Sequence, residues 1–180
     1  HADFVTPEYS VEPTVGGRKF EVCRGIGTSF GYMQYEDEST YMPADDLVRL
    51  LVNIVADGGN LLLNIGPMPD GWVPWAQQLR VLALGRWLSM NGCAIFGSRP
   101  HEVTRLATDE GHTVRLVRGE DACTYAMVCG RPTGATVQID GLPTGDVTLV
   151  HTGAAVARTG DRLVLPHRPD TTPVWTLRIT

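Results

Sequence analysis

Apolar residues in the first half of the chain follow a helical period and then a continuous run. In residues 43–59, PADDLVRLLVNIVADGG, the apolar side chains recur at spacings of three and four, with a proline and two aspartates at the start and two glycines at the end. This pattern predicts an amphipathic helix. The next segment, NLLLNIG at residues 60–66, is apolar without alternation, which predicts a strand buried on both faces, as in a parallel sheet. After a loop rich in proline and glycine, a second helix is predicted over residues 75–90, with Asn-Gly as its end signal.

The second half of the chain has a different pattern. In residues 101–180, short β-rich runs such as HTVRLVR, ATVQID and VWTLRIT are separated by turn signals such as RPTG and GLPTG, and no helical pattern interrupts them. This predicts a small antiparallel β-sandwich. The helix, strand, loop and helix of the first half predict an α/β layer, in which chemistry is expected in the loop after the strand, residues 64–73.

Composition narrows the class of protein. Hydrophobic residues make up 43% of the 180, which is enough for a packed core. The net charge is −5 and no basic stripe occurs, which argues against nucleic acid and anionic membranes as partners. No apolar stretch reaches the ~18–20 residues of a membrane span, and the first residues have neither the charged nor the apolar region of a signal peptide. The localisation stays open.

The cysteines and histidines predict no metal site. None of the four cysteines forms a CxxC pair, which argues against zinc, and the five histidines are scattered without metal-ligand spacing. Cys123 and Cys129 stand on one predicted strand, ~20 Å apart at ~3.3 Å per residue, which is too far for a disulfide. We therefore expect free, mostly buried thiols, and neither a metal nor an organic cofactor is indicated.

Two glutamates are candidates for acid–base chemistry. Glu8 stands in DFVTPEYS, where a charge on an exposed loop is the ordinary alternative, because most glutamates are exposed. Glu21 lies between apolar residues in KFEVCRG, which predicts partial burial; it is either a site residue or a structural partner of Arg18 or Arg24. Asp3 and Glu8 are not an obvious catalytic pair, since on one strand they would point to opposite faces.

Other residues of interest also have structural alternatives. Asp70 precedes a glycine in a common turn sequence, and Asn64 ends the predicted strand, where it can hydrogen-bond neighbouring strand ends. Phe30, Tyr32 and Tyr35 in SFGYMQY belong either to the core or to a wall on which a sugar stacks. The glycines of GGNLLLNIGP precede the predicted strand, whereas those of a dinucleotide-binding loop follow one, so dinucleotide binding is excluded.

Four segments of the chain occur in an order that is specific to one family. They are DFVTPEYS, FEVCRGIGTSFGY, GGNLLLNIGPMPDG and LGRWLSMNGCAIFGSRP, which together cover most of residues 2–100. In this order they closely resemble the α-L-fucosidases of glycoside hydrolase family 29. The β-rich remainder resembles that family only in general character.

The resemblance implies a fold and an activity. The implied fold is the C-terminal part of a (β/α) TIM-like barrel in residues 1–98, followed by a β-sandwich domain in residues 99–180. The implied activity is retaining hydrolysis of terminal α-L-fucosides from glycans, in which an aspartate attacks the anomeric carbon and a second carboxylate protonates the leaving oxygen. In the family, the motif with the nucleophile stands upstream of the TPEY-like segment. We therefore expect the nucleophile outside these 180 residues, on an N-terminal barrel segment in the same or a nicked chain.

The resemblance also implies roles for single residues. Glu8 matches the usual general acid/base, and Glu21 matches a glutamate that is the alternative for that role. Phe30 matches an aromatic residue that packs near the fucose methyl group, and we expect Tyr32 beside it to bind substrate. Where the family often reads NGEAIYG this chain reads NGCAIFG, which we expect to change packing and not catalysis. The alternative function is a carbohydrate-binding or interaction fragment without catalysis.

Overall fold

The computed structural model describes residues 4–10, 19–166 and 172–180. The chain divides into two compact units, His1–Arg86 and Trp87–Thr180. The predicted domain boundary between residues 98 and 99 coincides with the start of strand β4 (Arg99–Ala107). The division into residues 1–98 and 99–180 stays a prediction.

The first unit contains a parallel sheet with the order β1 (Phe4–Val5), β2 (Lys19–Gly25) and β3 (Asn60–Asn64). Helix α1 (Ala44–Ala56) precedes β3, and helix α2 (Trp75–Asn91) begins after the loop that follows β3. Both helices and the strand between them were predicted, and so was the parallel pairing. The spacing of the apolar residues in α1 decides which face of the helix packs against the sheet, because its buried side chains lie on that face.

The two faces of this sheet are not equally covered. Phe20 and Val22 of β2 are buried against Leu50 and Ile54 of α1. Successive residues of a strand point to opposite faces, so Leu62 points away from α1, and it is 50% exposed. The expectation that the NLLLNIG strand is buried on both faces is therefore wrong for the described part of the chain, since only its α1 side is covered there.

The second unit is built on antiparallel strands. The order in the sheet is β4-β5-β6-β11-β8-β9-β10-β7, and every pairing is antiparallel. A short 3₁₀ turn, η1 (Gly92–Ala94), precedes these strands. Their bounds are β4 Arg99–Ala107, β5 Thr113–Arg118, β6 Thr124–Cys129, β7 Thr136–Gln138, β8 Val147–Leu149, β9 Ala155–Thr159, β10 Arg162–Val164 and β11 Trp175–Ile179.

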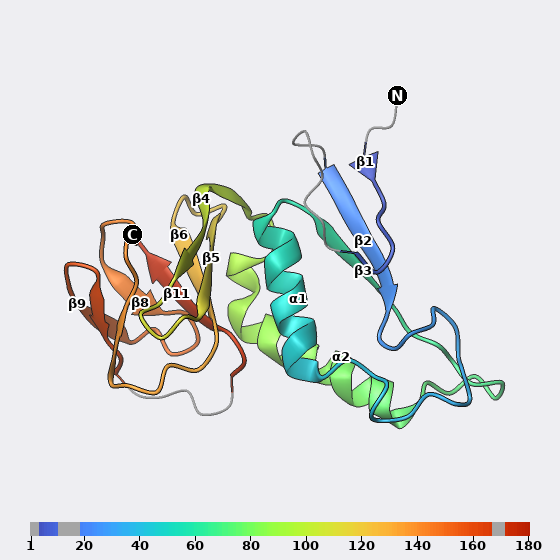
Figure 1. Ribbon diagram of the computed structural model, residues 1–180. Coiled ribbons are helices and arrows are strands. Elements are labelled where there is room, and N and C mark those ends of the chain that lie inside the picture. Colours follow the sequence, from blue (N-terminus) through green and yellow to red (C-terminus); the bar gives the residue numbers. More distant parts are fainter. Residues whose placement is uncertain (1–3, 11–18, 167–171) are drawn as a thin grey trace. The chain divides into compact units, whose positions relative to one another are not determined.

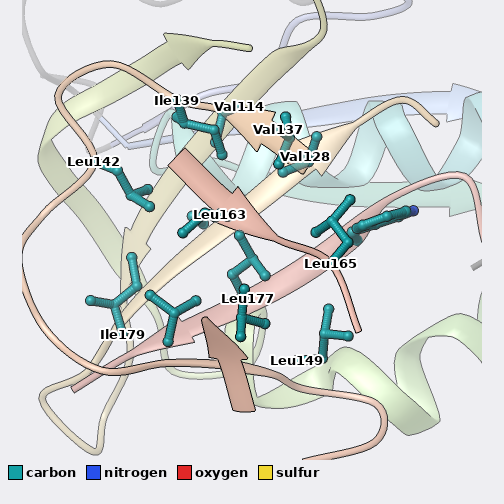
Figure 2. Packing of buried hydrophobic residues seen from close by; sticks show 14 of the residues in the cluster. Val114, Val128, Val137, Ile139, Leu142, Leu149, Leu163, Leu165, Leu177 and Ile179 are labelled. Carbon is teal, nitrogen blue, oxygen red and sulfur yellow. The ribbon is translucent and has the colours of Figure 1, made fainter. Parts of the chain in front are cut away.

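This sheet is curled, and the core lies inside the curl. An isolated bridge between Thr108, after β4, and Ile139, after β7, brings the first and last strands of the order together. Figure 2 shows apolar side chains of several strands converging, among them Val137, Leu163 and Leu177, which are fully or almost fully buried. The predicted antiparallel β domain is confirmed, but its strands follow one continuous order of pairing and not that of two separate sheets.

The thiols agree with the expectation only in part. All four cysteines lie in the described part of the chain and are free of disulfides. Cys123 is buried, and Cys23 and Cys129 are half-buried, but Cys93 is exposed. Cys93 follows the end of α2, in the segment where this sequence departs from the family that it resembles.

Candidate active site

The carboxyl ends of the parallel strands define the candidate site. Figure 1 shows that the loop after β2 and the loop after β3 leave the sheet at the same end. In folds with parallel strands, the loops at this end position the functional side chains. A residue of the candidate site should therefore lie near this end and on an accessible face of the sheet.

Glu8 lies on the face of the sheet that α1 does not cover. It follows β1 and forms an isolated parallel bridge with Cys23 of β2. The Cys23 N–H donates to the Pro7 carbonyl at 3.1 Å, and the Tyr9 N–H donates to the Cys23 carbonyl at 3.2 Å. Bridged residues point to the same face, and Cys23 alternates with the buried Val22. The Glu8 side chain is accordingly exposed on the open face, near the end of β2.

Glu21 lies on the same open face but farther from the carboxyl end. It is half-buried in β2 and is paired with Asn60 of β3. Glu21 stands two residues before Cys23, the bridge partner of Glu8, and thus ~7 Å deeper along the strand at ~3.3 Å per residue. Arg18, one of its two expected partners, is outside the described residues.

Arg24, the other expected partner of Glu21, contacts Tyr9. Its guanidinium lies 5.1 Å from the centre of the Tyr9 ring, and its Nε donates to the Gly25 carbonyl at 3.1 Å. Burial lowers the pKa of Arg24, and the neighbouring Tyr9 partly opposes that shift. Arg24 therefore supports the residue next to Glu8.

The aromatic residues after β2 divide into an anchored and an exposed group. The Phe30 ring meets the Tyr9 ring edge-on, with 5.1 Å between centroids and 67° between planes. The Asn64 side-chain amide donates to the Phe30 carbonyl, so it ties the end of β3 to this loop and not to a neighbouring strand end, as was expected. Tyr32 is 39% exposed and Tyr35 is 81% exposed. The structure thus brings Phe30 next to Tyr9, the residue that follows Glu8 in the chain, and leaves Tyr32 and Tyr35 accessible.

Two residues at this end were missed by the sequence analysis. The Tyr9 hydroxyl accepts a hydrogen bond from the Gly25 N–H at 3.2 Å. The Glu36 carboxylate accepts hydrogen bonds from Thr28 and Ser29. Neither contact has a signal in the sequence, because the partners are seven or more residues apart and lie outside any regular period. Asp70 has the predicted turn role, since its Oδ1 accepts from the Trp72 N–H at 3.0 Å.

Among residues 4–10, 19–166 and 172–180, no group of three or more His, Cys, Asp or Glu side chains is arranged to hold a metal ion. In the same ranges, no helix has both the length and the apolarity that crossing a membrane requires.

Comparisons with known proteins agree on one class. The family model described as alpha-L-fucosidase matches residues 1–93. Tissue alpha-L-fucosidase of Rattus norvegicus is 30% identical over the whole chain, and the match spans 41% of that protein. Alpha-L-fucosidase of Dictyostelium discoideum is 39% identical over 63% of the chain, and the match spans 24% of that protein. The crystal structure of Thermotoga maritima alpha-fucosidase in complex with fucose superposes on the whole chain with a TM-score of 0.85 and 33% identity, and the match covers 43% of that structure.

These relatives are glycoside hydrolases, and the open sheet face with its glutamates is consistent with that class. The chain belongs to the α-L-fucosidase family. It spans less than half the length of the relatives that it matches.

Proposed function

We propose that this chain is the C-terminal part of a retaining α-L-fucosidase, in which Glu8 is the general acid/base. The observation that carries the proposal is the position of Glu8: its bridge to Cys23 places it on the uncovered sheet face near the carboxyl end of β2. The membership of the α-L-fucosidase family supports the substrate, a terminal α-L-fucoside of a glycan. We further propose that β1, β2 and β3, with α1 and α2, are part of a (β/α) barrel.

The proposed mechanism requires a second carboxylate. In retaining glycosidases the two carboxyl groups are ~5–5.5 Å apart, one acting as nucleophile and the other first as acid and then as base. We assign the nucleophile to a part of the enzyme outside these 180 residues, because the chain spans less than half the length of its relatives. That part is the proposed partner of this chain and completes the barrel.

Glu8 has the support that a proton donor needs. Two backbone hydrogen bonds, from Cys23 to Pro7 and from Tyr9 to Cys23, hold the backbone on both sides of Glu8. Pro7 restricts Thr6 to extended conformations, which further limits this short segment. A general acid on a fixed backbone loses less entropy when its side chain is ordered at each turnover. Glu8 would protonate the leaving oxygen, and its carboxylate would then deprotonate the attacking water.

Phe30 and Tyr32 are the proposed substrate contacts. Phe30 is half-buried beside Tyr9, and its apolar ring suits the methyl group of L-fucose. Tyr32 is accessible on the same loop and suits stacking or hydrogen bonding to the sugar. Glu21 remains the alternative acid/base, since it lies on the same sheet face at greater depth.

The proposal is tested in the complete enzyme with Glu8→Gln and, as the matched control, Glu21→Gln. General acid–base catalysis contributes ~10²–10⁴-fold, so Glu8→Gln should lower kcat by about that factor for fucosides with poor leaving groups. An aryl fucoside with a good leaving group should lose less, and azide should partly restore its turnover. If Glu21→Gln shows this pattern and Glu8→Gln does not, the role belongs to Glu21.

A further inference from the structure

We propose that Glu36 is a positioning residue for substrate binding, because it fixes the loop that carries Phe30 and Tyr32. The inference rests on the proposed function of that loop as part of a fucoside-binding site. Glu36 stands six residues after Phe30 and four after Tyr32. Its carboxylate reaches back to the beginning of the loop, directly after β2.

One oxygen of Glu36 accepts three hydrogen bonds. The Thr28 N–H donates to Oε1 at 2.6 Å, the Thr28 hydroxyl at 2.7 Å and the Ser29 N–H at 3.2 Å. The other oxygen, Oε2, is buried and has no hydrogen-bond partner among the described residues. A buried acceptor without a partner is unfavourable, so the three bonds to Oε1 must outweigh that cost for this conformation to persist. The carboxylate therefore acts as a clamp on the Thr28–Ser29 turn.

The Glu36 carboxylate also packs closely against Gly27. A Cβ atom placed on Gly27 would lie 2.5 Å from Glu36 Oε1 and 2.6 Å from its Cδ, closer than real Cβ contacts occur. The carboxylate is enclosed between the Gly27 backbone and the two amides that it binds. The same clamp can thus be disturbed from two directions, by removing the carboxylate or by adding a methyl group at Gly27.

The clamped turn leads directly into the proposed substrate contacts. Phe30 follows Ser29, and its ring and carbonyl are held by Tyr9 and Asn64. Farther along, the backbone of Tyr32 passes closely over Gly66, where a Cβ atom would lie 2.5 Å from the Tyr32 nitrogen. Glu36 fixes the start of this path, and the other contacts fix its middle. Without Glu36, the donors of Thr28 and Ser29 lose their acceptor, and the loop that carries Phe30 and Tyr32 is no longer held at its start.

This role predicts a particular kinetic effect. Phe30 and Tyr32 would contact the sugar both before and during the reaction, whereas neither transfers a proton. Loss of an interaction that is equal in the ground state and the transition state raises KM and leaves kcat unchanged. A purely structural residue would instead lower the amount of folded enzyme and leave KM as it is.

The experiment compares Glu36→Ala and Gly27→Ala with Glu38→Ala in the complete fucosidase. Glu38 is the matched control, because it lies on the same loop, is 68% exposed and pairs with Arg80 at 2.9 Å. We expect Glu36→Ala and Gly27→Ala to raise the KM for an aryl α-L-fucoside about 10-fold, and the inhibition constant of free L-fucose by a similar factor. Their kcat should stay within about twofold of wild type, and Glu38→Ala should change neither constant beyond about twofold.

A conservative variant keeps the test decisive if one substitution prevents folding. Glu36→Gln retains an oxygen acceptor for Thr28 and Ser29, so its KM should lie much closer to wild type than that of Glu36→Ala. Unchanged KM in the folded Glu36→Ala and Gly27→Ala variants, or a loss confined to kcat, would overturn the positioning role. If the wild-type enzyme itself does not cleave α-L-fucosides, it is the proposed function that fails, and this outcome is recognised before any variant is compared.

Discussion

The proposed contact between Phe30 and the fucose methyl group can be tested by a cycle of protein and substrate changes. The perturbations are Phe30→Ala in the complete enzyme and replacement of the fucoside by the matching pyranoside that lacks the methyl carbon. The Phe30 ring is anchored edge-on to Tyr9, 5.1 Å between centroids, so it presents a fixed apolar surface. Burial of one methyl-sized group against such a surface contributes about 1 kcal/mol, or about fivefold in kcat/KM.

The assay is kcat/KM for both substrates with both enzymes. Wild type should prefer the methyl-bearing substrate, and Phe30→Ala should reduce that preference about fivefold beyond any loss common to both substrates. Tyr35→Ala, on the same loop and 81% exposed, is the control and should leave the ratio unchanged. If a folded Phe30→Ala enzyme keeps the full preference, Phe30 does not contact the methyl group and the assignment is wrong.

Two further predictions concern the β domain. Leu163 is fully buried in the core shown in Figure 2, so Leu163→Ala should lower the free energy of unfolding by about 2–5 kcal/mol in urea titrations. The neighbouring Val164, 47% exposed, is the control, since Val164→Ala should cost at most about 0.5 kcal/mol. For Asp121, burial raises the pKa, but hydrogen bonds from Tyr125, the Cys123 N–H and Arg178 outweigh it and hold the pKa of the carboxyl below its usual value. Its contribution to stability is therefore present above the unfolded-state pKa of ~3.9 and disappears as the pH falls through the lower folded-state pKa. The difference between wild type and Asp121→Asn, at most about 1 kcal/mol for this exposed pair, should shrink below pH ~4 and not above it.

Regular elements were predictable because they depend on local periods. The leucine, isoleucine and valine spacing of α1 and the short β-rich runs after residue 100 were sufficient to place these elements. The environment of β3 was not predictable in the same way. Its continuous apolar run indicated two buried faces, but the side chains that cover a strand come from elsewhere in the chain. In the described residues only the face toward α1 is covered, and Leu62 lies on the other face.

The candidate site was predictable only where a whole motif was available. Glu8 has no local feature that distinguishes it from an ordinary exposed glutamate, and only the four ordered segments pointed to it. Glu36 had no such support, because its partners lie seven and eight residues away across an irregular loop. Contacts of this kind arise from the path of the backbone, which residue patterns do not encode in any simple period. The exposed thiol of Cys93 was missed for the same reason.

The bridge between Thr108 and Ile139 has a consequence for how the β domain meets other molecules. An open strand with free backbone groups can recruit a strand from another copy and start aggregation. Here the Asp109 N–H donates to the Gln138 carbonyl at 3.0 Å, and the Gln138 N–H donates to the Asp109 side chain at 3.0 Å. Strand β7, the last in the order, therefore already has hydrogen-bond partners from its own chain. The strand at the other end, β4, carries a proline and an irregularity between Pro100 and Arg105, both of which hinder regular pairing with a neighbour. The curl thus protects the domain against edge-to-edge association between molecules.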